Sequence, residues 1–363
     1  MDNETITIYD VAREAAVSMA TVSRVVNGNQ NVKEATRRKV LDVIERLDYR
    51  PNAVARGLAS KKTTTVGVVI PDISNSYFAS LARGIDDIAT MYKYNIVIAN
   101  SDGDDDKEIN VVNTLLAKQV DGLVFLAHDL SDKIRAEFSR TRTPIVLAGA
   151  VDHESQIPSV NIDYKQATKD VTLELAKNNQ KIALVAGPMV NAINGKERLI
   201  GYQAALSESG QTFSEGLVFE TNYSFNDGMK LAERVKASGA TAAVVTDDEV
   251  AVGLLNGLVN NGVNVPEDFE IITANNSVIT EFTRPTLSSI EQPLYDLGAV
   301  SMRLLTKMMH KEEVDENPQQ SLKYHKSSLN FIKNTKIRGG DSPDNGLSGP
   351  TFNCFKCGQE HPW

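Results

Sequence analysis

From Val66 onward, short apolar runs alternate with segments that have the periodicity of amphipathic helices. Seven runs have the length and composition of buried strands: VGVVIPDI, NIVIAN, GLVFLA, PIVLAG, KIALVAG, AAVVTDD and EIITAN. Continuous apolar strands separated by helices are typical of a parallel sheet that is covered on both faces. The runs form a set of four and a set of three, so the sequence predicts an α/β fold with two parallel-sheet lobes.

These two Rossmann-like lobes are expected to exchange segments of the chain. Connections near Asn161–Tyr164 and Glu291–Pro293 would link them, and a helix at 294–311 would return to the first lobe. A polar strand at about 322–334 would close the core. The predicted N-lobe comprises residues 63–162 and 292–322, and the predicted C-lobe comprises residues 163–291 and 323–337.

Residues 1–50 contain no strand candidate and have the pattern of three short helices. The first begins after Thr7, with Asp10 three residues later as in a capping box, and the second runs from Ser18 to Gly28. Two helices joined by a short turn hold a fixed angle, so the first can support a second one that enters the major groove of DNA. We interpret this region as a helix-turn-helix head; a small helical bundle for protein contacts is the alternative.

The charge of the chain is unevenly distributed. Residues 1–62 contain 11 Lys+Arg and 8 Asp+Glu, a balance of +3, whereas the whole chain has a net charge of −9. A basic head on an acidic body suits a head that meets an anion. The polar N-terminus does not resemble a signal peptide and no 18-residue apolar run occurs, so a cytoplasmic protein is expected.

After Ile337 the composition shifts toward Gly, Pro, Ser and Asn, and we expect residues 338–363 to be a disordered or non-native tail. This tail holds Cys354, Cys357 and His361, which are three zinc ligands where a structural site needs four. No glycine-rich nucleotide loop and no catalytic constellation is recognised. We therefore expect no metal, no other cofactor and no enzymatic activity.

Three stretches, TIYDVAREAAVSMATVSRVVNG, RPNAVARGLAS and TTTVGVVIPDISNSYF, resemble the lactose-repressor and galactose-repressor family over residues 5 to about 335. The resemblance implies a DNA-binding head, a hinge, and a periplasmic-binding-protein-like core that dimerises. Met19 and Ala20 stand where the family varies its base readers. Other DNA contacts implied by the match are Tyr9, Ser18, Thr21, Ser23, Arg24, Asn27, Asn31 and Thr36.

The segment PNAVARGLASKK, residues 51–62, stands at the family's hinge position. A helix there would be short and would contain Gly57, so it would be marginal on its own. Leu58 matches the family's wedge residue, and minor-groove binders insert such apolar side chains between base steps. We expect the hinge to become helical only on operator DNA, with a permanent linker helix as the alternative. The implied hinge contacts are Asn52, Ala55, Leu58 and Ala59.

Two parallel-sheet lobes place a ligand crevice at the carboxyl ends of their strands. Arg198 begins the family's R..GY motif and by resemblance bonds an effector; an ordinary surface arginine is the alternative. The family usually has Gly-aromatic-Asp where this chain has Thr-Ala-Asn at 273–275, and no stacking aromatic is recognised in the first lobe. The expected effector-cleft residues are Arg198, Asp247 and Asn275.

The segment LYDLGAVSMRLLTKMMHK has an apolar stripe and a charged face at helical spacing. Asp296, Arg303 and Lys307 align on that face, and the two cations are one turn apart, which suits a phosphate group. A charged face that meets only solvent is the alternative.

This helix and the stretches KKTTTVGVVIPDISN, ARGIDDIATMYKYNI and QVDGLVF resemble the branch of the family that controls carbon catabolism in Gram-positive bacteria. That branch takes a protein corepressor, the phosphocarrier protein HPr phosphorylated on a serine. The resemblance implies a homodimeric transcription regulator on a pseudo-palindromic operator; a repressor that responds to a sugar or sugar phosphate in the cleft is the alternative. The implied corepressor contacts are Asp87, Met91, Tyr295, Asp296, Val300, Arg303 and Lys307.

Overall fold

The computed structural model describes residues 6–50, 62–127, 129–152, 157–313, 319–322, 352–353 and 360–361. The predicted hinge at 51–62 lies outside this set except for Lys62, so Asn52, Ala55, Leu58 and Ala59 remain predictions. Among the described residues, no helix has both the length and the apolar character that crossing a membrane requires.

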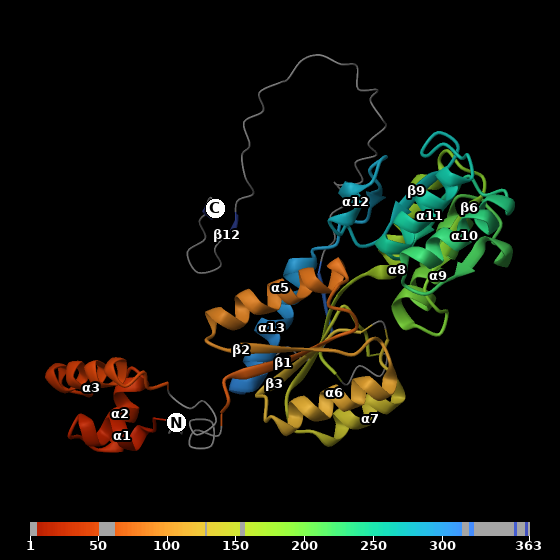
Figure 1. Ribbon diagram of the computed structural model, residues 1–363. Helices are drawn as coiled ribbons and strands as arrows, with labels where there is room; N and C mark the ends of the chain where they lie inside the picture. The colour runs from red at the N-terminus through yellow and green to blue at the C-terminus, as the bar shows by residue number, and fades with distance from the viewer. Residues whose placement is uncertain are drawn as a thin grey trace, which may run out of the picture. The chain divides into compact units, whose positions relative to one another are not determined.

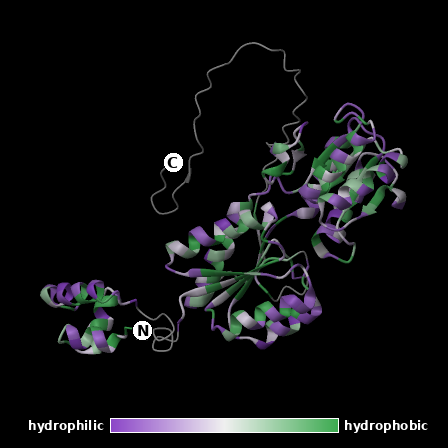
Figure 2. Cartoon of the chain, in the orientation of Figure 1, coloured by the Kyte–Doolittle hydropathy of each residue, from purple (hydrophilic) through white to green (hydrophobic). Residues whose placement is uncertain are grey.

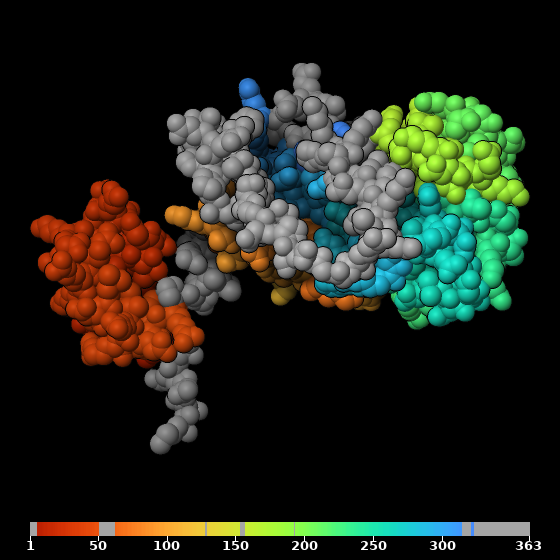
Figure 3. Space-filling view, turned by 90° about the horizontal axis from the view of Figure 1, so that it is seen from above, coloured from red at the N-terminus to blue at the C-terminus, as the bar shows by residue number. Residues whose placement is uncertain are grey.

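The head consists of three helices around one small core, and its closely packed atoms are red in Figure 3. As predicted, Ser18 accepts a hydrogen bond from the backbone N–H of Thr21 (3.2 Å), and the second helix stops before Gly28, whose φ is +69°. The ion pair between Glu14 and Arg46 (2.6 Å) joins the first helix to the third. The helices are α1 (Ile8–Glu14), α2 (Met19–Val26) and α3 (Glu34–Arg46).

The N-lobe is a six-stranded parallel sheet with the order β11-β5-β4-β3-β1-β2. Alternate strand residues face opposite helix layers: Val68 packs with α5 and α13, whereas Val69 packs with α6 and α7. Figure 1 shows these two pairs of helices on opposite faces of the sheet. The strands are β1 (Thr65–Ile70), β2 (Asn95–Asn100), β3 (Gly122–Phe125), β4 (Ile145–Ala148), β5 (Ser159–Ile162) and β11 (Gln319–Leu322). The helices are α5 (Ser76–Met91), α6 (Asp105–Ala117), α7 (Asp132–Arg140) and α13 (Leu294–His310).

The C-lobe repeats this plan with a five-stranded parallel sheet of order β10-β9-β8-β6-β7. Helices α8 and α9 cover one face and α10 and α11 the other. The strands are β6 (Ile182–Ala186), β7 (Val218–Glu220), β8 (Ala242–Val245), β9 (Glu270–Thr273) and β10 (Ser288–Ser289). The helices are α8 (Tyr164–Ala176), a π-helical turn at Ala192–Glu197, α9 (Arg198–Glu208), α10 (Phe225–Ala237), α11 (Asp248–Asn260) and the short α12 (Ile279–Phe282), with a 3₁₀ turn at Glu215–Leu217.

The two-lobed α/β fold predicted from the apolar runs is confirmed, and hydrophobic residues fill the strands between the helix layers (Figure 2). The helix predicted at 294–311 packs on the N-lobe sheet, as expected for a returning segment. The described strand Gln319–Leu322 runs parallel to β5, whereas the closing strand predicted at about 322–334 lies outside the described residues except for Leu322 and stays a prediction. Strands β5, β7 and β10 were missed because they are short or polar.

The residues described near the C-terminus form a small antiparallel pair. Phe352–Asn353 (β12) pairs with Glu360–His361 (β13), in a segment where the sequence predicted no strand. The predicted zinc-ligand candidates Cys354 and Cys357 lie outside the described residues.

Candidate functional site

The start of α2 gives the head an exposed polar surface. Ser18, Met19, Ala20 and Arg24 are exposed, and Thr21 is partly exposed, whereas Val22 and Val25 on the opposite side fill the core. The Ser18 and Thr21 hydroxyls lie 2.9 Å apart, next to the free N–H groups at the helix start. Such a helix N-terminus attracts phosphate groups. Helix α2 therefore exposes its polar N-terminal side, as a recognition helix must in order to contact DNA.

The other predicted head residues lie around this surface. Tyr9 on α1 is 66% exposed, and Asn27 donates a side-chain hydrogen bond to the Ser23 hydroxyl (3.3 Å). Asn31 is exposed and Thr36 is partly exposed at the start of α3. All are accessible to a partner of the head.

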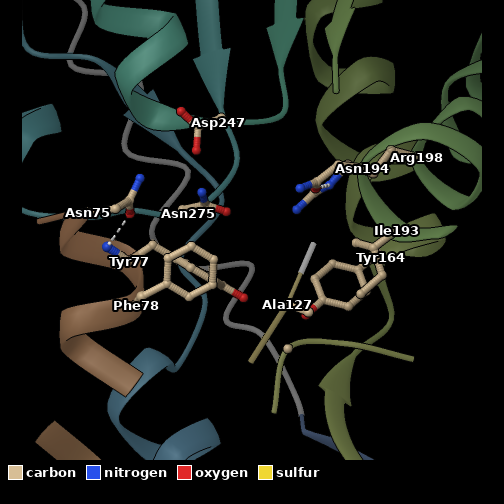
Figure 4. A pocket seen from close by; sticks show the side chains of 11 residues that line it. Asn75, Tyr77, Phe78, Ala127, Tyr164, Ile193, Asn194, Arg198, Asp247 and Asn275 are labelled. Atoms are coloured by element: carbon tan, nitrogen blue, oxygen red, sulfur yellow. Dashed lines mark hydrogen bonds between the residues drawn. The ribbon is translucent and has the colours of Figure 1, made fainter. Parts of the chain in front are cut away.

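A narrow pocket lies where the carboxyl ends of the two sheets face each other, as predicted for the effector cleft. Figure 4 shows the side chains that α5 contributes opposite those from α8 and the start of α9. Its volume is about 20 Å³, which is room for little more than one water molecule. The lining residues are Asn75, Tyr77, Phe78, Ala127, Gly149, Tyr164, Ile193, Asn194, Arg198, Asp247 and Asn275.

Arg198 is 1% exposed, so the alternative of an ordinary surface arginine is wrong. Its Nε donates to Asn194 Oδ1 (3.1 Å), and its guanidinium carbon lies 5.2 Å from the centre of the Tyr164 ring. Burial lowers the pKa of the Arg198 guanidinium, and the nearby tyrosines oppose that shift. A buried cation with its face on an aromatic ring is a suitable partner for an anionic or hydroxylated ligand.

Asp247 is the carboxylate of this pocket and also the N-cap of α11. Its Oδ1 accepts hydrogen bonds from the backbone N–H groups of Glu249 (2.9 Å) and Val250 (3.2 Å). Burial, followed by the charge of Asp248, raises the pKa of Asp247 to about 7. The pocket therefore contains a carboxyl group that changes its protonation state near neutral pH.

Asn275 stands where the family usually has an aspartate. Its Oδ1 accepts a hydrogen bond from Gln292 Nε2 (2.9 Å), which occupies the carbonyl end of the side-chain amide. The amide N–H₂ end is the one left to meet a ligand. The pocket consequently offers a donor at this position, where a carboxylate would offer an acceptor for a sugar hydroxyl.

Two aromatic residues on α5, Tyr77 and Phe78, line the pocket from the N-lobe. No stacking aromatic was expected in the first lobe from the sequence, and that expectation was wrong. The signal was available in SNSYF, because Asn75 caps α5 by accepting from the backbone N–H of Tyr77 (2.9 Å). A helix cap in the loop that follows a buried strand, here β1, places the next residues at the mouth of the cleft.

A second predicted surface lies on the outer side of α5 and α13. These helices are in backbone contact, because a Cβ at Gly84 would collide with the carbonyl oxygen of Tyr295. The Tyr295 hydroxyl donates to Asp87 Oδ2 (3.2 Å), which Arg83 also contacts at 3.3 Å. Burial, followed by the hydrogen bond to Asp87, raises the pKa of Tyr295, and the charge of Arg303 opposes that shift.

The charged face predicted for α13 is exposed. Asp296, Arg303 and Lys307 are exposed, Val300 is partly buried, and Met91 on α5 is 61% exposed. Leu297, Leu304 and Leu305 on the other side are buried in the N-lobe core. Within the described part of the chain, neither Arg303 nor Lys307 forms a hydrogen bond or an ion pair.

Known protein families match both the two-lobed core and the helical head. Residues 63–324 match the model of periplasmic binding proteins and the sugar binding domain of the LacI family, and residues 7–52 match that of bacterial regulatory proteins of the lacI family. The chain belongs to the LacI family. The match to the second model covers the predicted helix-turn-helix, so the alternative of a bundle for protein contacts alone is rejected.

Individual relatives narrow the assignment within the LacI family. The chain is 68% identical to catabolite control protein A of Streptococcus mutans over 314 residues, covering 86% of this chain and 94% of that protein. It is 52% identical to catabolite control protein A of Priestia megaterium over 86% of this chain and 95% of that protein. These relatives are regulators and not enzymes, in agreement with the expectation from the sequence.

Solved structures agree with this assignment. The crystal structure of transcription regulator CcpA of Lactococcus lactis superposes with a TM-score of 0.69 at 53% identity, over 72% of this chain and 96% of that one. The lac repressor dimer bound to operator and the anti-inducer ONPF gives 0.78 at 26% identity, over 88% and 97%. The chain is therefore a DNA-binding transcription regulator of the LacI family that is similar to catabolite control protein A.

Proposed function

We propose that this LacI-family regulator acts in the cytoplasm as a homodimer on a pseudo-palindromic operator, with serine-phosphorylated HPr as its corepressor. The observation that carries the proposal is the pair of exposed cations on α13, Arg303 and Lys307, which have no partner among the described residues. The similarity to catabolite control protein A favours control of carbon catabolism as the biological role.

The chemistry of the α13 face suits a phosphorylated protein. Arg303 and Lys307 are one helical turn apart, so both can contact one phosphate group. A phosphoserine brings roughly −1.5 to −2 charges at pH 7. Two cations that are not already paired with an anion therefore favour its binding. Val300, one turn before Arg303 on α13, and the exposed Met91 on α5 supply apolar surface, and Asp296 can accept a hydrogen bond from a basic group of the partner.

The head supplies the DNA contacts in this proposal. The exposed start of α2 would enter the major groove, with Met19 and Ala20 toward the bases and with Ser18, Thr21 and Arg24 toward phosphates or a guanine edge. Tyr9, Ser23, Asn27, Asn31 and Thr36 would hold the backbone. The solved lac repressor complex with operator, a dimer of the same family, supports a two-fold arrangement.

Corepressor and operator are proposed to act through one conformational equilibrium. Binding of phospho-HPr to the N-lobes would favour the arrangement in which two hinges meet over the operator, with Leu58 inserted in the minor groove. A partner shifts such an equilibrium only by its different affinity for the two states. Reciprocity then requires that operator DNA tighten phospho-HPr binding by the same factor.

The test is an operator titration followed by fluorescence anisotropy at fixed salt, with and without serine-phosphorylated HPr. We expect phospho-HPr to tighten operator binding by about 5- to 150-fold, the range of typical coupling energies. Arg303→Ala should remove this enhancement and leave basal operator binding nearly unchanged. Lys230→Ala, at an exposed cation on α10 that pairs with Asp227 (3.5 Å), is the matched control and should keep it.

Full enhancement in Arg303→Ala would reject the α13 contact, and absence of enhancement in the wild type would reject the corepressor. A sugar or sugar phosphate in the cleft is the second candidate, supported by the buried Arg198. Because the inner pocket holds only about 20 Å³, such a ligand requires the lobes to open first. Enhancement by glucose 6-phosphate alone in the same titration would favour this second candidate.

A further inference from the structure

The chain enters the N-lobe through a bend at Thr63–Thr65, directly after the segment predicted to be the hinge. Thr64 has a φ of +50°, which is the left-handed region of the backbone. This conformation is rare for a β-branched residue, because the side chain then crowds the backbone. Thr64 is also exposed, so packing of its side chain in the core does not hold it there. Other groups of the N-lobe must hold the bend.

The carboxylate of Asp121 holds the bend from both sides. Its Oδ1 accepts a hydrogen bond from the backbone N–H of Thr63 (3.2 Å), and its Oδ2 accepts one from the backbone N–H of Thr65 (3.3 Å). Two N–H groups in a turn that contains a left-handed residue form a concavity that suits an anion. The Thr63 hydroxyl adds a hydrogen bond to the carbonyl oxygen of Gln119 (2.9 Å). The bend is therefore fixed by residues that are more than 50 positions away in the sequence.

Both the bend and Asp121 are connected to the packed sheet of the N-lobe. The carbonyl oxygen of Thr64 accepts a hydrogen bond from the backbone N–H of Asn95, the first residue of β2 (2.9 Å). Gly122 follows Asp121 and is the first residue of β3, and a Cβ there would lie 2.9 Å from side-chain atoms of α13. Asp121 thus stands at the edge of a closely packed region, whereas the bend that it holds leads to the hinge.

We propose that Asp121 is a positioning residue for operator binding. By holding the left-handed bend at Thr64, it sets the direction in which the hinge and the head leave the N-lobe. A dimer on a two-fold operator needs both heads at a defined spacing, because the half-sites are a fixed number of base pairs apart. Binding to DNA of random sequence has no such requirement, because it depends on charge alone. The inference rests on the proposed function as an operator-binding dimer.

The test is a fluorescence-anisotropy titration of the full chain at fixed salt, without phospho-HPr. The probes are a duplex that the wild-type protein selects from a random pool, and a random-sequence duplex of equal length. Asp121→Asn replaces one acceptor oxygen by an N–H₂ group, so the side chain no longer accepts from both sides of the bend. We expect operator affinity to fall by at least about tenfold, the scale of a hydrogen bond to a charged group. Affinity for random DNA should change by less than about twofold.

Asp268→Asn is the matched control. Asp268 also accepts a hydrogen bond from a backbone N–H, that of Asn264 (3.1 Å), but it belongs to the C-lobe. This variant should leave both affinities within about twofold, because the substitution does not affect the bend. Circular dichroism checks that each variant is folded.

A second pair of variants tests the bend without changing Asp121. Proline at position 64 is restricted to φ near −65° and cannot adopt the bend, whereas asparagine tolerates the left-handed region. Thr64→Pro should therefore lose as much operator affinity as Asp121→Asn, and Thr64→Asn should bind the operator as the wild type does. This pair decides the question if Asp121→Asn does not fold.

The outcomes separate this inference from the proposed function. Unchanged operator affinity in folded Asp121→Asn or in Thr64→Pro would overturn the inference and leave the proposed function standing. Equal losses on operator and random DNA would also overturn it, because they indicate a general loss of folded protein. A loss in Thr64→Asn as large as that in Thr64→Pro would do the same. If the wild type selects no duplex from the pool, the proposed function fails and this inference fails with it.

Discussion

The helix pair α5–α13 in the N-lobe and the pair α10–α11 in the C-lobe are built in the same way but present different surfaces. In each pair both helices contribute a glycine at the contact. A Cβ at Gly298 would collide with the carbonyl oxygen of Leu81, and a Cβ at Gly253 would collide with that of Phe225. Both pairs thus pack backbone against backbone on a parallel sheet.

The difference lies in the exposed cations. On α10, Lys230 pairs with Asp227, Lys236 donates to the carbonyl oxygen of Asn261 (2.7 Å), and Arg234 lies over the Phe219 ring. On α13, Arg303 and Lys307 have no hydrogen bond or ion pair within the described chain. The same scaffold therefore carries a self-contained surface in one lobe and a surface with unneutralised charge in the other. Similar packing of two helix pairs on a sheet therefore does not by itself identify a binding surface.

The largest expected effect tests the shared packing. Gly298→Val and Gly253→Val should each lower the free energy of unfolding by roughly 3 kcal/mol, because the added carbons force two helix backbones apart. Urea unfolding of each variant measures it. Gly216→Ala is the control, since a Cβ there would meet only the Ser214 hydroxyl at 3.6 Å, and it should change stability by less than about 0.5 kcal/mol. If one of the two valine variants were as stable as the wild type, the two helix pairs would not share the same close backbone packing.

The next prediction concerns the N-terminal ends of helices α11 and α13. Helix α11 begins at the buried carboxylate Asp247, whereas the N-cap of α13 is Pro293, which has no such group. The pKa of Asp247 is about 7 in the folded state, above its value in the unfolded chain. The folded protein therefore binds this proton more tightly, and that stabilisation is lost as the pH rises from about 4 through 7.

Asp247→Asn keeps a good N-cap without the titrating group. Between pH 5 and pH 8 it should gain roughly 2 kcal/mol of stability relative to the wild type, because one pKa unit corresponds to ~1.4 kcal/mol. Urea unfolding at both pH values measures this difference. Ser224→Ala, at the cap of α10, should instead lose about 1 kcal/mol at both. A pH-independent difference between wild type and Asp247→Asn would contradict the assignment.

The smallest expected effect concerns the exposed cations of α13 and α10. Lys307→Glu places a carboxylate where a phosphate is proposed to bind, and it should weaken phospho-HPr binding by about tenfold at low salt. Lys230→Glu makes the same change on α10 and should alter the affinity by less than about twofold. Surface plasmon resonance with serine-phosphorylated HPr measures both. Equal losses in the two variants would mean a general charge effect rather than a site on α13.

Much of this architecture followed from local patterns. The apolar runs predicted most of the strands, Ser18 and Gly28 bounded the second helix of the head, and the stripe in α13 faced the core as expected. The short strands β5, β7 and β10 were missed because their pairing, and not their composition, makes them strands. The cleft residues Tyr77 and Phe78 were also missed, since an aromatic residue after a cap is equally consistent with a buried core position.

By itself, the sequence determined the order of the main helices and of most strands, the exposed side of α2 and the spacing of the cations on α13, because all of these depend on residues only a few positions apart. The tertiary structure alone decided that Arg198 is buried against Tyr164 and that Asp121 holds the bend at Thr63–Thr65. Burial and the loss of hydration depend on residues brought together from distant parts of the chain. Such surroundings have no local signature, so they emerge only when the lobes are assembled.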